Sequence, residues 1–148
     1  MNRLEAERIP TIPHAKGKRV GIVSATFHID IAKTMLDAAK QRIISHGALL
    51  GPIVTVPGAY ETPLAASRLL KQKNIDAVVV LGTILQGATS HDEVIGSAVA
   101  KQLLELQMQH DKPVGFGITG PRMRLAQARA RAVPHARRAV DAALLLCR

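Results

Sequence analysis

Short, densely apolar runs alternate with longer amphipathic segments along the chain. Runs of this kind, rich in Val, Ile and Leu, are typical of strands that are covered on both faces. The predicted strands are residues 19–25, 53–56, 75–81 and 114–118. Apolar side chains at helical spacing predict helices from about Asp30 to His46, from Thr62 onward, from about Ser90 to Gln109, and over residues 122–132 and 134–146, which Pro134 divides. Strands that alternate with helices predict an α/β fold, with a four-stranded parallel sheet and helices on both faces in three α/β/α layers.

The length of 148 residues fits one domain with a hydrophobic core. We expect this domain to span residues 19–148. Residues 1–18 are polar and carry two prolines, which indicates an N-terminal arm. Such an arm either docks in extended form on another subunit or is a disordered tail.

The loops after the four predicted strands should meet. Right-handed crossovers place the carboxyl ends of parallel strands at one edge of the sheet, where open α/β sheets bind ligands. The loops at this edge contribute Phe27 and His28, then residues 59–61, then residues 83–91, then residues 116–121. Topology therefore predicts a site at this edge.

The segment 82–94 combines a glycine-containing loop with a helix start. Free backbone N–H groups and the helix dipole favour an anion at such a position. Ser90 and Glu93 have the spacing of a capping box, as do Thr89 and Asp92. The first turn then carries His91, whose imidazole exchanges protons near neutral pH. These features fit a phosphate site beside a proton-transfer group, and they also fit an ordinary capped helix with a surface histidine.

Other side chains of the predicted edge allow two interpretations each. Phe27 could stack on a planar ring or could cover the end of the sheet. Glu61 could accept hydrogen bonds from a ligand, or it could be a first-turn glutamate favoured by the helix dipole. Arg131 could hold a phosphate through its planar guanidinium, or it could be one more exposed arginine.

The net charge of +9 is concentrated near the C-terminus. From Pro121 onward, Asp141 is the only acidic residue, and the basic residues are Arg122, Arg124, Arg129, Arg131, Arg137, Arg138 and Arg148. Such a block attracts phosphates, acidic partners or nucleic acid, or it is a solvated helix face. Nucleic acid is disfavoured, because only 2% of the residues are aromatic and no nucleic-acid-binding module is recognisable.

Several functional classes are disfavoured by the sequence. No apolar run approaches the roughly 20 residues of a membrane helix, and no export signal is visible. The single Cys147 excludes an internal disulfide and fits a cytoplasmic protein. The six histidines lack paired helical spacing, so we expect no metal site. Neither a P-loop nor a dinucleotide-binding glycine fingerprint is present.

Two loops carry a family resemblance. Residues 56–63 (VPGAYETP) and 82–91 (GTILQGATSH) resemble the signature loops of 6,7-dimethyl-8-ribityllumazine synthases, and Gly21 to Phe27 resembles the first strand of that family. The resemblance extends from about Arg19 to Leu146. It implies a flavodoxin-like fold, a homopentamer or a multiple of pentamers, and active sites between subunits. It also implies a transferase that condenses 5-amino-6-(D-ribitylamino)uracil with 3,4-dihydroxy-2-butanone 4-phosphate in riboflavin biosynthesis, without metal or organic cofactor.

The resemblance also implies roles for single residues. Phe27 would stack on the pyrimidine. Ala59, Tyr60 and Glu61 would hold the ribityl chain and ring, while Thr83, Ile84 and Leu85 would bind the ring edge largely through backbone groups. Ala88 and Thr89 would hold the phosphate, and His91 would transfer protons. Phe116 and Arg131 would come from the neighbouring subunit, with Arg131 as the second phosphate ligand.

The sequence departs from the family pattern mainly in its C-terminal third. Gln86 stands where many members have a basic residue, and Gly120-Pro121-Arg122 replaces a polar, acidic loop. Arg131 takes its role only with a one-residue shift, so Arg129 is a competing candidate. Arg137 or Arg138 replaces a lysine that is common in the family near the start of the last helix. Two alternatives are a non-catalytic flavin- or pterin-binding shell protein and an archaeal-type riboflavin synthase, which resembles this family distantly.

Overall fold

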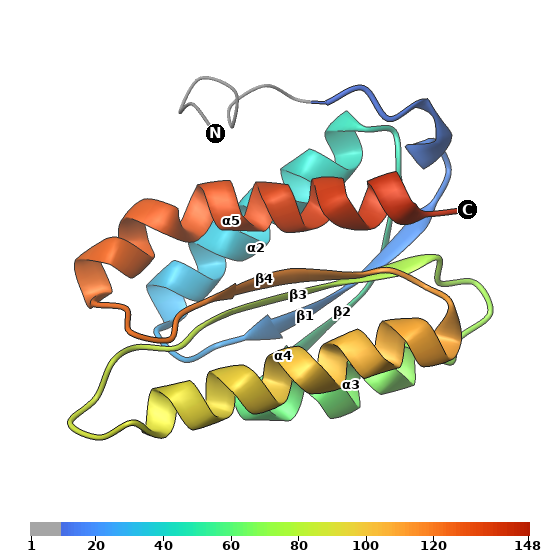
Figure 1. Ribbon diagram of the computed structural model, residues 1–148. Coiled ribbons are helices and arrows are strands. Elements are labelled where there is room, and N and C mark those ends of the chain that lie inside the picture. Colours follow the sequence, from blue (N-terminus) through green and yellow to red (C-terminus); the bar gives the residue numbers. More distant parts are fainter. Residues whose placement is uncertain (1–9) are drawn as a thin grey trace.

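A computed structural model describes residues 10–148 and contains one four-stranded sheet (Figure 1). The strands are β1 (Arg19–Ala25), β2 (Leu49–Val56), β3 (Ala77–Thr83) and β4 (Val114–Thr119). Their order is β2-β1-β3-β4, and all three pairings are parallel. This arrangement confirms the predicted α/β fold. β1 and β3 lie in the middle and are almost entirely buried, as their dense apolar composition predicts.

The edge strand β2 begins four residues earlier than predicted, at Leu49 instead of Ile53. This part of the strand was not predicted because it contains Gly51 and Pro52, and both residue types are uncommon inside strands. The pairing with β1 shifts register between Val20 and Ile22, opposite these two residues. Proline lacks a backbone donor, and an edge strand with an irregularity at that point accommodates it.

Two helices cover each face of the sheet (Figure 1). One face carries α2 (Ile29–Ser45) and α5 (Leu125–Leu146), and the other carries α3 (Thr62–Leu70) and α4 (His91–His110). The two hydrophobic clusters follow this division. Alanines dominate the buried face of α5, which lets the helix approach the sheet closely. None of the helices in residues 10–148 is long and apolar enough to span a bilayer.

α5 is a single helix, so the predicted division at Pro134 was wrong. Proline inside a helix removes one backbone hydrogen bond, at a cost of about 3 kcal/mol. The side chain of Pro134 is exposed, so the carbonyl that loses its partner can be hydrated. The burial of Ala128, Ala132, Ala136 and Ala139 on both sides of the proline outweighs this cost.

Part of the predicted N-terminal arm packs against the rest of this chain. Ile12 and Ala15 are buried in the core cluster beneath α2 and α5. A short 3₁₀ turn at Pro13–Ala15 places His14 Nε2 within 3.0 Å of the carbonyl of Leu144 and 3.1 Å of that of Leu145. Residues 1–9 lie outside the described residues. The division into an arm and a domain at residue 18 therefore stays a prediction.

A buried ion pair joins α2 to α5. Arg42 Nε and Nη2 donate to the two carboxylate oxygens of Asp141 at 2.8 and 2.7 Å, and His46 Nε2 lies 2.8 Å from Oδ1 of the same carboxylate. The Arg42 side chain is only 6% exposed. A bidentate pair with a third partner satisfies charges that would otherwise be costly to bury.

We expect Asp141→Ala to lower the free energy of unfolding by about 3 kcal/mol, because the Arg42 guanidinium would stay buried without its anion. Urea denaturation measures this loss. Asp37→Ala, at an exposed aspartate of α2, is the control and should change the same free energy by no more than about 0.5 kcal/mol. A loss below about 1 kcal/mol in Asp141→Ala would show that the ion pair does not join the two helices energetically.

Candidate functional site

A cleft of about 440 Å³ opens at the carboxyl edge of the sheet. Segments from the ends of β1, β2 and β3 and from the start of α4 form its walls. Most of the residues singled out in the sequence meet here, as the topology predicts. The lining residues are Phe27, Gly58, Ala59, Tyr60, Glu61, Thr83, Ile84, Leu85, Gly87, Thr89, His91, Asp92 and Ile95.

Phe27 stands at the mouth of the cleft, two residues beyond the end of β1. Its side chain is 52% exposed, although exposed phenylalanine is uncommon. The ring packs edge-to-face on His28, with ring centroids 4.9 Å apart. His28 has φ of 57°, which turns the chain directly into α2. The aromatic face of Phe27 is therefore available to a planar ligand.

A 3₁₀ turn at Ala59–Glu61 forms the wall beyond β2. Thr62 Oγ1 donates to the carbonyl of Ala59 at 2.7 Å and secures the turn to the first residue of α3. Ala59 is buried, while the side chains of Tyr60 and Glu61 are exposed. Glu61 makes no capping hydrogen bond to α3, so its carboxylate is not used to cap this helix.

Thr83, Ile84 and Leu85 form the floor of the cleft. The N–H groups of Ile84 and Gln86 donate to the carbonyls of Thr119 and Met123, each at 2.8 Å. Leu85 lies between these two bonded amides, and its N–H has no backbone partner among the turn and loop bonds of residues 10–148. The floor thus presents backbone groups to a ligand while its neighbours are held in place.

The start of α4 differs from the predicted capping box. The helix begins at His91, as expected, but the side chain of the N-cap residue Ser90 makes no capping bond. Thr89 Oγ1 accepts a long bond of 3.4 Å from the N–H of His91. Asp92 and Glu93 instead bind Arg122 in the loop after β4. Tertiary partners outcompete the local capping pattern here.

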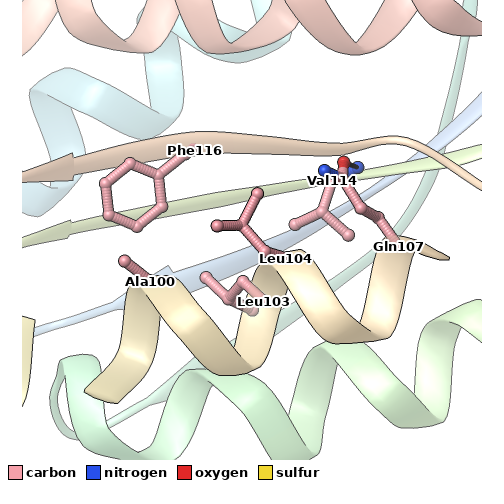
Figure 2. A pocket seen from close by; sticks show the side chains of 6 residues that line it. All are labelled: Ala100, Leu103, Leu104, Gln107, Val114 and Phe116. Carbon is pink, nitrogen blue, oxygen red and sulfur yellow. Dashed lines mark hydrogen bonds between the residues drawn. The ribbon is translucent and has the colours of Figure 1, made fainter. Parts of the chain in front are cut away.

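Three predicted residues lie outside the cleft of this chain. Ala88 lines an adjacent hollow that shares Gly87, Thr89 and Asp92 with the cleft. Phe116 faces an apolar groove between β4 and α4 (Figure 2). Arg131 is exposed on α5. The structure therefore does not bring Phe116 and Arg131 to the cleft within one chain.

The two competing arginines of α5 have different surroundings. Arg129 forms an ion pair with Asp30 at the start of α2. The hydrogen bond from this guanidinium lowers the pKa of the Asp30 carboxyl. Arg131 makes no ion pair within residues 10–148. Arg131 is thus the arginine available to an outside anion.

Four lining residues were missed by sequence reasoning as site residues: Gly58, Gly87, Asp92 and Ile95. Ile95 is four positions after His91, so helical spacing could have placed it on the same face. Asp92 was assigned only to a cap, and no sequence signal shows its contact with a loop 30 residues away.

The described residues hold no group of three or more His, Cys, Asp or Glu side chains that could bind a metal ion. The Cys147 thiol is buried at the C-terminal end of α5 and does not line the cleft. Burial and the nearby Asp76 raise its pKa to about 11, which makes it a poor nucleophile.

The 6,7-dimethyl-8-ribityllumazine synthase family model matches residues 17–148. The chain belongs to this family. It is 46% identical over 128 residues to the 6,7-dimethyl-8-ribityllumazine synthase of Staphylothermus marinus, covering 84% of this chain and 83% of that protein. The enzymes of the same name from Methanobrevibacter smithii and Halobacterium salinarum are 38% and 43% identical, each over 86% of this chain and over 92% and 96% of their own lengths.

Family membership confirms the resemblance found in the two signature loops. The chain is a transferase of riboflavin biosynthesis with 6,7-dimethyl-8-ribityllumazine synthase activity. Its fold is the flavodoxin-like α/β arrangement expected from that resemblance. The matches give no support to the alternatives of a riboflavin synthase or a non-catalytic binding protein.

We expect Phe27→Ala to weaken the binding of 6,7-dimethyl-8-ribityllumazine about tenfold, because a planar ring loses its stacking surface. Calorimetric titration measures the dissociation constant. The exposed Ile29, two residues further along and outside the cleft, provides the control Ile29→Ala, which should bind as the unaltered protein does. Equal affinities in the two variants would exclude Phe27 as a stacking residue.

Proposed function

We propose that the cleft condenses 5-amino-6-(D-ribitylamino)uracil with 3,4-dihydroxy-2-butanone 4-phosphate, releasing phosphate and water, and that the roles of its residues follow the family pattern. The observation that carries this proposal is the convergence of an aromatic ring, a glutamate, an imidazole and a helix N-terminus in one cleft. Two reactants held side by side lose much of the entropic barrier to their condensation.

The pyrimidine binds at the β1 side of the cleft in this proposal. Phe27 stacks on the ring, and the Ala59–Glu61 turn holds the ring and the ribityl chain. The N–H of Leu85, which has no backbone partner among the turn and loop bonds of residues 10–148, supports recognition of the ring edge through the backbone. Hydrogen bonds from backbone groups fixed by neighbouring bonds orient a ring without a large entropic cost.

The phosphate of the second substrate binds at the start of α4. Ala88 and Thr89 lie on the loop that leads into this 20-residue helix, whose first N–H groups and dipole favour an anion. His91, in the first turn, then lies between the phosphate end and the ring end of the cleft. Imine formation, loss of phosphate and ring closure each require proton transfer, and an imidazole can serve all three steps near neutral pH.

The cleft of a single chain offers little positive charge to this substrate, because the one arginine that lines the adjacent hollow, Arg122, is already paired with Glu93. Its lining includes the carboxylates Glu61 and Asp92, but no lysine or arginine. A phosphorylated substrate beside two carboxylates needs positive charge that the helix dipole supplies only in part. This imbalance supports completion of the site by Arg131 of a second copy.

The groove between β4 and α4 supports the same assembly (Figure 2). Its lining is mainly apolar: Ala100, Leu103, Leu104, Gln107, Val114 and Phe116. Leu104 is 57% exposed and Phe116 is 43% exposed. Contiguous exposed apolar side chains mark contact surfaces. The groove lies at the β4 edge of the sheet, while the cleft is built mainly from β1, β2 and β3. A contact between the groove of one copy and the cleft of the next would therefore be head-to-tail.

Head-to-tail contact closes into a ring when the rotation fits, and we propose a homopentamer or a multiple of pentamers. Phe116 and Arg131 would then reach the cleft of the neighbouring copy. The exposed arginines of α5 would bring positive charge to the phosphate. Partial burial and the nearby Arg138 guanidinium lower the pKa of His135 on the same helix. The single, unpaired Cys147 fits a reducing compartment, and we place the reaction in the cytoplasm.

The purified protein should form 6,7-dimethyl-8-ribityllumazine and free phosphate from the two substrates. His91→Ala should slow turnover on the order of 10²-fold, because a proton-transfer group is lost. Product fluorescence and phosphate release measure the rate, and sedimentation checks that the assembly is unchanged. A wild-type rate in the variant would remove His91 from the mechanism, and the absence of enzymatic product from the unaltered protein would overturn the proposal.

Sites shared between copies can be tested by mixing two inactive variants. His91→Ala and Arg131→Ala subunits, unfolded together and reassembled in equal amounts, should regain activity in about a quarter of their sites, where an intact cleft meets an intact Arg131. Arg129→Ala is the control for Arg131→Ala and should keep most of its activity. Failure of the mixture to exceed either variant alone would contradict a shared site.

A further inference from the structure

The loop between β4 and α5 supports the floor of the cleft from behind. The bonds from Ile84 N–H to the Thr119 carbonyl and from Gln86 N–H to the Met123 carbonyl join the two segments, each at 2.8 Å. The first bond reaches the last residue of β4, and the second lies beyond the ends of both β3 and β4. Residues 84 and 86 are therefore anchored to residues 119 and 123.

Two glycines let the loop approach this closely. A Cβ on Gly120 would lie 2.2 Å from the carbonyl oxygen of Ile84, and Gly120 has φ of +103°, which other residues rarely adopt. On α4, a Cβ on Gly96 would lie 3.1 Å from Cδ of Pro121. The loop is thus packed between the cleft floor and α4 without space for another side chain.

Asp92 holds this loop to the start of α4. Its Oδ2 accepts a hydrogen bond of 2.8 Å from the backbone N–H of Arg122. Arg122 has φ of 58°, a left-handed conformation that arginine rarely adopts, so a specific contact is needed to keep it there. Asp92 is only 6% exposed, and a buried carboxylate is retained at low cost only when it is hydrogen-bonded.

The position of Asp92 connects this contact to the substrates. Asp92 lines the cleft and also the adjacent hollow, together with Gly87 and Thr89. Of the ring-edge residues, Thr83 and Ile84 are held directly by β4, whereas residues 87–90 have no strand beside them. Their support comes from the junction of α4 with the loop after β4, where Asp92 supplies the buried hydrogen bond beside the exposed Glu93–Arg122 ion pair.

We infer that Asp92 is a positioning residue for the phosphate-binding segment, acting through the Arg122 amide, in a role that rests on the proposed function of the cleft. Its carboxylate does not attract the substrate, because an anion at this point repels phosphate. Its contribution is the hydrogen bond that fixes residues 120–123 behind the phosphate end. Loss of the acceptor loosens the phosphate end most, because Thr83 and Ile84 at the ring end are still held by Thr119, the last residue of β4.

The test compares Asp92→Ala, which removes the acceptor, with Asp92→Asn, which keeps an acceptor oxygen without the charge. Asp92→Ala should raise KM for the butanone phosphate on the order of tenfold and change KM for the ribitylaminouracil less than twofold. Asp92→Asn should keep both values within twofold. Glu93→Gln is the matched control, because its 2.5 Å ion pair reaches the exposed side chain of the same Arg122.

Amide hydrogen exchange gives a readout that does not depend on catalysis. Residues 86–91 and 119–124 should exchange faster in Asp92→Ala than in Asp92→Asn, even if the unaltered protein makes no product and the proposed function fails. Equal increases of both KM values, an Asn variant that behaves like the Ala variant, or unchanged exchange would each overturn the inference. If Asp92→Ala does not fold, Asp92→Ser replaces it in the test, because the shorter polar side chain of serine does not reach the Arg122 amide.

Discussion

The right-handedness of parallel crossovers is the constraint on which the site depends. From β1 the chain crosses to β2 over one face of the sheet, and from β2 and β3 it moves the opposite way over the other face. α2 and α4 therefore leave the carboxyl ends of the neighbouring strands β1 and β3 on opposite faces (Figure 1). The connections that follow β1 and β3 diverge at this point and leave a crevice between them. Ligands of open α/β sheets bind at such a switch point.

The same topology explains why one chain offers only part of the chemistry. α5, which carries four arginines against a single aspartate, lies on the α2 face, and none of its residues lines the cleft of its own subunit. In the proposed ring, the acidic cleft of one copy meets the basic helix of the next. Each contact then combines apolar burial in the groove with charge neutralisation around the phosphate. Assembly and substrate binding would share one surface.

Much of the fold could be predicted because its signals are local. β1 and β3 are predominantly apolar, and α2 and α4 begin close to their predicted residues. The errors occurred where tertiary contacts override local preference. Pro134 stays inside α5 because alanines on both sides are buried, and residues 49–52 join β2 because β1 provides a partner.

The candidate site likewise contains residues that local sequence predicts and residues that only tertiary contacts bring together. The residues of the signature loops were found from sequence because they follow strand ends, and most of them line the cleft. Asp92 was misassigned because its partner is Arg122, and only the fold brings these two residues together. The family resemblance added roles that no spacing rule supplies, and those of Phe116 and Arg131 concern a second copy of the chain.

The scarcity of aromatic residues has a practical consequence. The chain has no tryptophan and a single tyrosine, Tyr60, which is 72% exposed on the wall of the cleft. Nearly all intrinsic ultraviolet emission of the protein must therefore originate at that wall. A bound heterocycle that absorbs in the near ultraviolet would quench this emission by energy transfer. Occupancy could then be followed without any label, since the molecule carries one built-in optical reporter beside its own ligand.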